Sequence, residues 1–115
     1  MKIDKFEDIL AWQKAKLMAL KIYTLLRNIK DIAFRDQICR ASVSIMNNIA
    51  EGFERKSDKE FIHFLFIAKG SCGEVRSMLY LAKDLSYIEN TEYQYLLNTS
   101  IEVSKMLSGL IKTLN

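Results

Sequence analysis

The single histidine of this 115-residue chain, His63, follows Glu60 at a spacing that has chemical meaning. Carboxylate di-iron bundles place a Glu-x-x-His motif on each of two helices, so that glutamate and imidazole ligands face one metal pair. The chain holds no second histidine with which to complete that site. Ser57, three residues before Glu60, predicts a helix N-cap with a capping box, which gives the glutamate a structural role. We therefore expect neither a metal site nor a cofactor.

Nucleophilic catalysis lacks a visible set of partners as well. His63 is the only imidazole base, and it lies in the apolar run 61–68 with no motif that links it to a serine or cysteine. Gly70-Ser71-Cys72-Gly73 lacks the lysine of a phosphate-binding loop, and we interpret its small residues as a place where a neighbouring helix approaches closely. Cys39 and Cys72 lack ligand spacing and are expected to be core residues in a reducing cytoplasm. We expect that the protein is not an enzyme.

A line of polar side chains lies on the helix predicted over residues 34–54 and just beyond it. Serine and asparagine compete with the backbone for hydrogen bonds, so helix propensity alone does not explain them. We interpret the line as a structural polar network that fixes helix register or subunit geometry, and a contact with a ligand or partner is the open alternative. We assign Arg40, Asn47, Asn48, Glu51 and Arg55 to this network, with Ser44 alongside.

Positive charge is concentrated near the start of the chain. Residues 1–30 hold seven Lys/Arg and three Asp/Glu, a net charge of +4, whereas the remainder sums to −1. A basic helix face attracts the phosphates of nucleic acid, and a ring of subunits would multiply the field of each chain. A solvated helix face is the other interpretation. The candidate phosphate contacts are Lys14, Lys16, Lys21, Arg27 and Lys30.

Apolar residues recur at helical spacing in four segments, which must position all of these groups. The segments predict helices over residues 6–29, 34–54, 58–85 and 91–114 in a single domain, 1–115. The chain has no proline and only four glycines, so few residues break a helix. Short loops between long helices predict an all-α, antiparallel up-down-up-down four-helix bundle. No long uncharged apolar stretch and no signal-peptide pattern occur, so we expect a cytoplasmic protein without membrane contact.

A second apolar line on the first predicted helix lies away from its core face. Leu10, Leu17 and Leu20 stand among polar residues there, although an outer helix of a monomer needs only one apolar stripe. We expect these leucines, together with Phe64 from the apolar run 61–68, to form an oligomer interface. Scattered surface leucines are the competing interpretation.

Several motifs occur along almost the whole chain: Trp12-Gln13-Lys14-Ala15, Arg40-Ala41-Ser42-Val43-Ser44-Ile45, Asn48-Ile49-Ala50-Glu51-Gly52, Arg55, Glu60-Phe61, Phe64-Leu65 and Ala68-Lys69-Gly70-Ser71. Together they closely resemble one family, the small four-helix-bundle proteins encoded in intervening sequences of bacterial 23S ribosomal RNA genes. These proteins are sometimes misnamed ribosomal proteins. One departure is Met46, where many members have proline, and we expect a locally straighter helix there.

The resemblance implies a cytoplasmic bundle that assembles as a homopentameric ring. It also implies distant kinship to the accessory protein of diversity-generating retroelements, a basic pentameric barrel that binds nucleic acid and a reverse transcriptase. The family's own activity is not established. Our first hypothesis is a non-enzymatic, homo-oligomeric protein that binds rRNA or other structured nucleic acid through a basic first helix. The alternative is a scaffold that holds a partner protein, such as a mobile-element polymerase, without binding nucleic acid directly.

Overall fold

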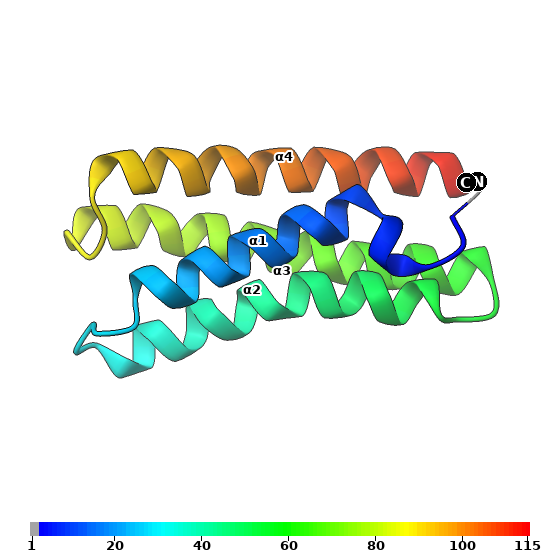
Figure 1. Ribbon diagram of the computed structural model, residues 1–115. Coiled ribbons are helices and arrows are strands. Elements are labelled where there is room, and N and C mark those ends of the chain that lie inside the picture. Colours follow the sequence, from blue (N-terminus) through cyan, green and yellow to red (C-terminus); the bar gives the residue numbers. More distant parts are fainter. Residues whose placement is uncertain (1–2) are drawn as a thin grey trace.

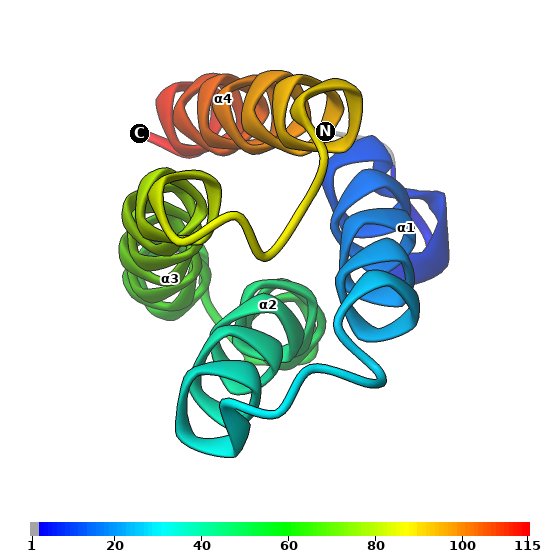
Figure 2. The same ribbon diagram turned by 90° about the vertical axis from the view of Figure 1, so that its left-hand side faces the viewer.

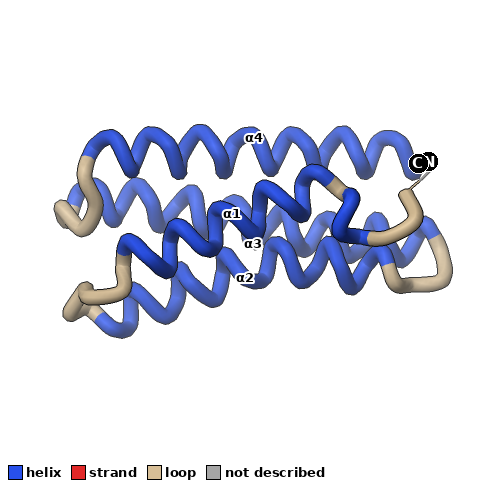
Figure 3. Tube along the Cα trace, viewed as in Figure 1, coloured by secondary structure: helices blue, strands red, loops and turns tan. Residues whose placement is uncertain are grey.

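The protein is an antiparallel bundle of four long helices in a computed structural model that describes residues 3–115. A 3-10 turn, η1 (Phe6–Asp8), precedes α1 (Leu10–Leu25), α2 (Ile32–Phe53), α3 (Asp58–Asp84) and α4 (Asn90–Leu114). The helices run alternately up and down and lie around the core in chain order (Figures 1 and 2). The loops that connect the four long helices lie at the two ends of the bundle, and a short non-helical break separates η1 from α1 (Figure 3). This architecture confirms the predicted all-α bundle, and no strand occurs within residues 3–115.

The first helix is shorter at both ends than the predicted range of 6–29. Ile9 is extended, with φ −76° and ψ 119°, and separates η1 from α1. This break turns the Ile9 side chain into the core, where it is 3% exposed, and the ring of Phe6 meets that of Trp12 edge-on at 5.2 Å. At the other end Leu26 leaves helical geometry while its side chain stays buried. The gain from burying apolar side chains outweighs helix continuation at both ends.

The second helix begins two residues earlier than predicted because Asp31 caps it. One carboxylate oxygen of Asp31 accepts the backbone N–H of Phe34 at 3.1 Å. The other oxygen accepts the hydroxyl of Tyr87, which follows α3, at 2.7 Å. These two hydrogen bonds hold the pKa of Asp31 below its ordinary value, and the bond from Tyr87 has the larger effect. The helix then continues through Met46 without interruption to Phe53.

The third helix begins at the predicted cap and ends in a left-handed residue. The Ser57 hydroxyl oxygen accepts the backbone N–H of Glu60 at 3.1 Å, and the Glu60 carboxylate accepts the Ser57 hydroxyl at 3.4 Å. Ser86 has φ 59°, and the backbone N–H of Tyr87 returns to the carbonyl of Ala82 at 2.8 Å. This arrangement is a Schellman motif, which usually places glycine at the left-handed position.

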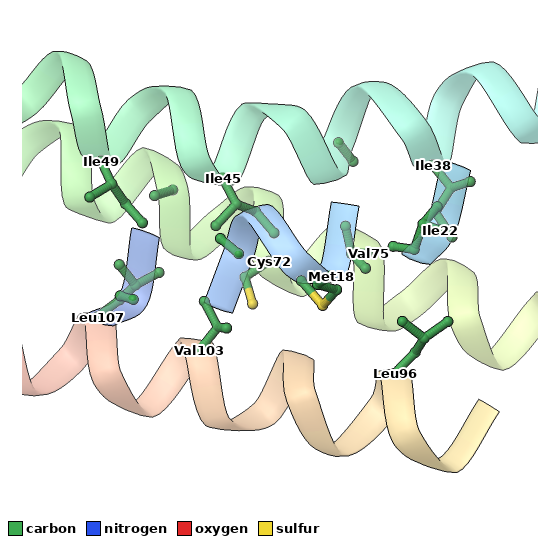
Figure 4. Close-up of a cluster of buried hydrophobic side chains, with 14 of the residues drawn as sticks. Met18, Ile22, Ile38, Ile45, Ile49, Cys72, Val75, Leu96, Val103 and Leu107 are labelled. Carbon is green, nitrogen blue, oxygen red and sulfur yellow. The ribbon is translucent and has the colours of Figure 1, made fainter. Parts of the chain in front are cut away.

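The core is a continuous apolar column to which all four helices contribute (Figure 4). Cys39 and Cys72 are free and buried within it, as predicted. The thiol of Cys72 donates to the carbonyl of Ser100 at 3.0 Å, and burial raises its pKa to about 11. The labelled side chains of Figure 4 are Met18, Ile22, Ile38, Ile45, Ile49, Cys72, Val75, Leu96, Val103 and Leu107.

Among the glycines, the close helix approach lies at Gly52. A Cβ added at Gly52 of α2 would lie 2.6 Å from the Cβ of Phe64 on α3. A Cβ added at Gly70 or Gly73 would meet nothing within 4 Å, so in the predicted Gly70–Gly73 segment the contacts with neighbouring helices come from Ser71 and Cys72 and not from the glycines. Both of those glycines are exposed, whereas Gly52 is buried.

Candidate nucleic-acid interface

Two of the predicted phosphate contacts on α1 face α4, where acidic residues meet them. The Lys14 Nζ lies 2.9 Å from Glu102 Oε1, and the Lys21 Nζ lies 3.2 Å from Glu92 Oε2. Lys21 also lies over the ring of Tyr95, 4.9 Å from its centroid. Because each lysine has a carboxylate partner, most of its charge is compensated within the chain.

The other predicted residues lie on the opposite side of α1 or just after it. Lys16 lies over the Trp12 ring at 5.6 Å, and it precedes Tyr23 by seven residues, so both side chains are on one side of α1. Arg27 and Lys30 are exposed in the segment that connects α1 to α2. None of Lys16, Arg27 and Lys30 forms an ion pair within residues 3–115. The five residues therefore do not form one surface, since Lys14 and Lys21 face the other way.

A groove between the end of α1 and the first half of α2 gathers arginines that were not all predicted to bind phosphate. Its volume is about 550 Å³, and it is called the α1–α2 groove below. Sequence analysis assigned Arg40 to a structural network and overlooked Arg35, because both belong to α2 and their approach to Arg27 depends on the fold. The lining residues are Tyr23, Arg27, Arg35, Asp36, Cys39, Arg40 and Val43.

The groove carries an excess of positive charge. Asp36 is its only acidic lining residue, and its Oδ1 lies 3.5 Å from Arg35 Nε. The Nη1 of Arg35 also donates to the backbone carbonyl of Arg27 at 3.4 Å, which ties the start of α2 to the segment that precedes it. Burial raises the pKa of the Cys39 thiol at the groove, so that group is neutral at physiological pH. Three arginines and one aspartate thus line the groove.

The polar line of α2 divides into a network and two side chains that lie apart from it. Asn48 Nδ2 donates to the backbone carbonyl of Ser44 at 2.8 Å and to its hydroxyl at 3.0 Å. The Ser44 hydroxyl pairs with that of Ser71 on α3 at 2.8 Å, so the network joins the two helices. Arg40 lines grooves on both sides of α2, and Asn47 is exposed.

At the end of α2, Arg55 binds the start of α3. Its Nη2 lies 2.9 Å from Glu51 Oε2, its Nη1 lies 4.0 Å from Glu60 Oε1, and its guanidinium stacks over the ring of Phe64 at 4.7 Å. Phe64 is half-buried against α2 in this way and through its contact with Gly52. The chain alone therefore accounts for the position of Phe64, which lies away from the leucine line of α1.

The three leucines of that line are strongly exposed. Leu10, Leu17 and Leu20 are 62%, 57% and 61% accessible, among the highest values for large apolar side chains in the described chain. His63 is also exposed, with its ring 5.5 Å from that of Phe64. Across residues 3–115, no three side chains of the metal-binding types come together. No helix in the same range combines the length and apolar character needed to cross a bilayer.

Comparison with known proteins gives a consistent result. The pattern of the 23S rRNA-intervening sequence protein family matches residues 7–109. A crystal structure of a protein with unknown function from the S23 ribosomal protein family of Bacteroides thetaiotaomicron superimposes with a TM-score of 0.84. The two sequences are 31% identical, and the alignment covers 90% of this chain and 99% of the other. None of the curated proteins compared with the chain matches it.

Proposed function

Because the chain belongs to the family of 23S rRNA-intervening sequence proteins, we propose that it is a non-enzymatic, cytoplasmic protein that associates with structured RNA. The observation that carries this proposal is the excess of positive charge in and near the α1–α2 groove. Lys16, Arg27 and Lys30 have no acidic partner within residues 3–115, and the arginines of the α1–α2 groove continue the same surface. RNA phosphates are the polyanion that such a surface attracts.

The test is an anisotropy titration of the purified protein against a labelled 23S rRNA hairpin at several salt concentrations. Affinity is expected to fall steeply as salt rises, because each neutralised phosphate releases a counterion. Reversing Lys16 and Arg27 to glutamate should weaken binding strongly. The same reversal of Lys105 on α4 serves as the control, because this exposed lysine lies on another helix. Absence of binding at low salt would refute RNA association.

Charge reversal at Lys14 and Lys21 should weaken binding less than reversal at Lys16 and Arg27. The two lysines already face Glu102 and Glu92, so they have less charge to offer to phosphates. Equal losses of RNA affinity from the two pairs of substitutions would indicate that both sides of the first helix contact RNA.

We further propose that the protein forms a homo-oligomer, a pentameric ring, through the exposed leucine line of α1. Three leucines that are each more than half exposed form the kind of apolar patch that marks a protein contact. Light scattering should give a mass of several chains for the unmodified protein. Leu17→Glu should dissociate the assembly and leave its helical content intact, whereas Leu81→Glu, at an exposed leucine on α3, should not. A single-chain mass for the unmodified protein would refute this interface.

A scaffold for a partner protein, such as a mobile-element polymerase, is the second candidate function. The same leucine line favours it, because an apolar surface suits a protein partner better than it suits RNA. Affinity capture after nuclease treatment separates the two functions. A stoichiometric protein that survives the nuclease and is lost with Leu20→Glu favours the scaffold, and recovery of RNA alone counts against it.

A further inference from the structure

We propose that the α1–α2 groove holds one unpaired nucleotide of an RNA strand, with its phosphate on the arginines and its base on the ring of Tyr23. This inference rests on the proposed RNA association. It adds a specific binding site and a preference for single-stranded segments.

The groove has the dimensions of a small-ligand site. Its volume of about 550 Å³ lies within the range of about 300–1,000 Å³ that is typical of such sites. Its lining combines apolar residues, among them Val43 and the buried Cys39, with the charged residues named above. A flat basic face would bind phosphates without such a recess, so the shape indicates that more than a phosphate enters.

The arginines match a phosphodiester. Arg27 and Arg40 form no ion pair within residues 3–115, so their guanidinium groups are available to a ligand. Arg35 shares its charge with Asp36 and donates to the carbonyl of Arg27, which ties it to the segment that precedes α2. Guanidinium binds phosphate oxygens in a bidentate manner, which lysine does not, and all three basic lining residues are arginines.

Tyr23 supplies the aromatic surface that a base requires. Its side chain is 48% exposed although it lines the groove, so part of the ring is open to a ligand. Unpaired bases stack on such rings, whereas the bases of a duplex are already stacked and do not reach them. Lys16, two helical turns before Tyr23 on the same side of α1, extends the path for the next phosphate by about 10 Å.

The test compares a fluorescein-labelled oligouridylate with an RNA duplex of the same length. The protein should bind the single strand more tightly than the duplex. Arg40→Ala should lower affinity for the single strand about tenfold, whereas Arg76→Ala should change it less than twofold. Arg76 is the matched control because it is exposed on α3, lines no part of the groove and forms no ion pair within residues 3–115.

Two further variants separate the roles of base and phosphate. Tyr23→Ala should lower affinity for the oligouridylate about tenfold and leave duplex binding unchanged, and Tyr23→Phe should retain wild-type affinity. Tyr80→Ala, at an exposed tyrosine on α3, is the control. Asp36→Asn should raise affinity several-fold, because it removes the only carboxylate of the groove. A misfolded variant would lose affinity, so a gain of affinity in Asp36→Asn cannot be explained by misfolding.

The outcomes distinguish this inference from the proposed function. If the wild-type protein binds RNA and the Arg40, Tyr23 and Asp36 variants bind equally well, the groove is not the site and RNA association stands. If wild-type protein binds neither RNA, both proposals fail. If inorganic phosphate displaces the oligouridylate as effectively as uridine monophosphate does, the groove is a general anion site that does not recognise a base. Displacement by an acidic peptide at lower concentrations would assign the groove to a protein partner.

Discussion

Helices α2 and α3 make close and polar contacts along their length, whereas long charged side chains link α1 and α4 at their exposed edge. The first contact, here called the α2–α3 seam, includes the Gly52–Phe64 approach, the Ser44–Ser71 hydroxyl pair and the Asp31–Tyr87 hydrogen bond. The second, the α1–α4 edge, includes the Lys14–Glu102 and Lys21–Glu92 ion pairs, with side chains 30–50% exposed. The two contacts lie on opposite sides of the bundle (Figure 2).

This difference shows how one bundle combines a fixed half with a more adaptable helix. Contacts between backbone and small side chains leave little freedom, because interiors are packed as densely as organic crystals. Exposed ion pairs contribute little and exchange readily with water and salt. The leucine line belongs to α1, the helix whose contact with α4 is the weaker kind, and the proposed RNA surface lies where α1 and the segment after it meet α2. The predictions that follow test this contrast, beginning with the largest effect.

The strongest test of the α2–α3 seam is Gly52→Ala. The new methyl group would lie 2.6 Å from the Phe64 Cβ and 3.3 Å from the carbonyl oxygen of Phe61, so the helices must separate. We expect a loss of about 1–3 kcal/mol in the free energy of unfolding, measured by urea denaturation. Gly70→Ala is the matched control at an open helical position, and it should stabilise the protein by about 0.5–1 kcal/mol. Equal effects at the two glycines would contradict the close approach.

Asn48→Ala tests the polar part of the same seam. It removes two hydrogen bonds to Ser44, at 2.8 and 3.0 Å, in a half-buried position. The expected cost is about 1 kcal/mol in the free energy of unfolding, because a typical intramolecular hydrogen bond contributes on that scale. Asn47→Ala, at the exposed neighbour, is the control and should have little effect. A neutral result for Asn48 would show that its two bonds to Ser44, which lie within α2, do not support the Ser44–Ser71 link.

The α1–α4 edge should tolerate much more. Replacing Lys14 and Lys21 with methionine removes both ion pairs and keeps most of the apolar stem of each side chain. We expect a loss below about 1 kcal/mol for the double variant, and a smaller loss in high salt. A loss of unfolding free energy as large as that of Gly52→Ala would show that the α1–α4 edge is as important for stability as the α2–α3 seam. Thermal unfolding at two salt concentrations provides the measurement.

The smallest effect concerns pH and the far end of the seam. The pKa of Asp31 is lowered, first by the Tyr87 hydroxyl, so its contribution to stability is present above the unfolded-state pKa of about 3.9. That contribution is lost as the pH falls through the lower folded-state pKa. Tyr87→Phe should therefore destabilise the protein at neutral pH, and the difference from wild type should shrink below about pH 4. A constant difference across this range would show that the hydroxyl does not act through Asp31.

The helices and the core could be predicted from the sequence because both follow from local periodicity. The core face of α2, with Ile38, Ile45 and Ile49, is visible in the sequence as an apolar repeat. Ser57 predicts the start of α3 because it is a favourable N-cap residue. The break at Ile9 could not be predicted in this way, because it depends on the position of Trp12 in the folded bundle. In the sequence, the residues on either side of Ile9 do not differ from those of the other predicted helices.

The candidate site was predictable only in part. Arg27 was identified from its own segment, but its approach to Arg35 and Arg40 requires the turn that brings α2 back along α1. The partners of Lys14 and Lys21 lie about 70–90 residues later in the chain, so their compensation was invisible to counts of local charge. Spatial neighbours of this kind are set by topology, which a one-dimensional charge pattern does not encode.

The two cysteines allow local opening of the bundle to be measured by thiol labelling. Cys39 lines the α1–α2 groove and is 6% exposed, whereas Cys72 lies in the central column and is 1% exposed. A thiol reagent therefore needs only a small local opening beside α1 to reach Cys39, and it reaches Cys72 only when the core opens. The ratio of the two labelling rates would then show whether the bundle opens beside α1 while the core stays closed.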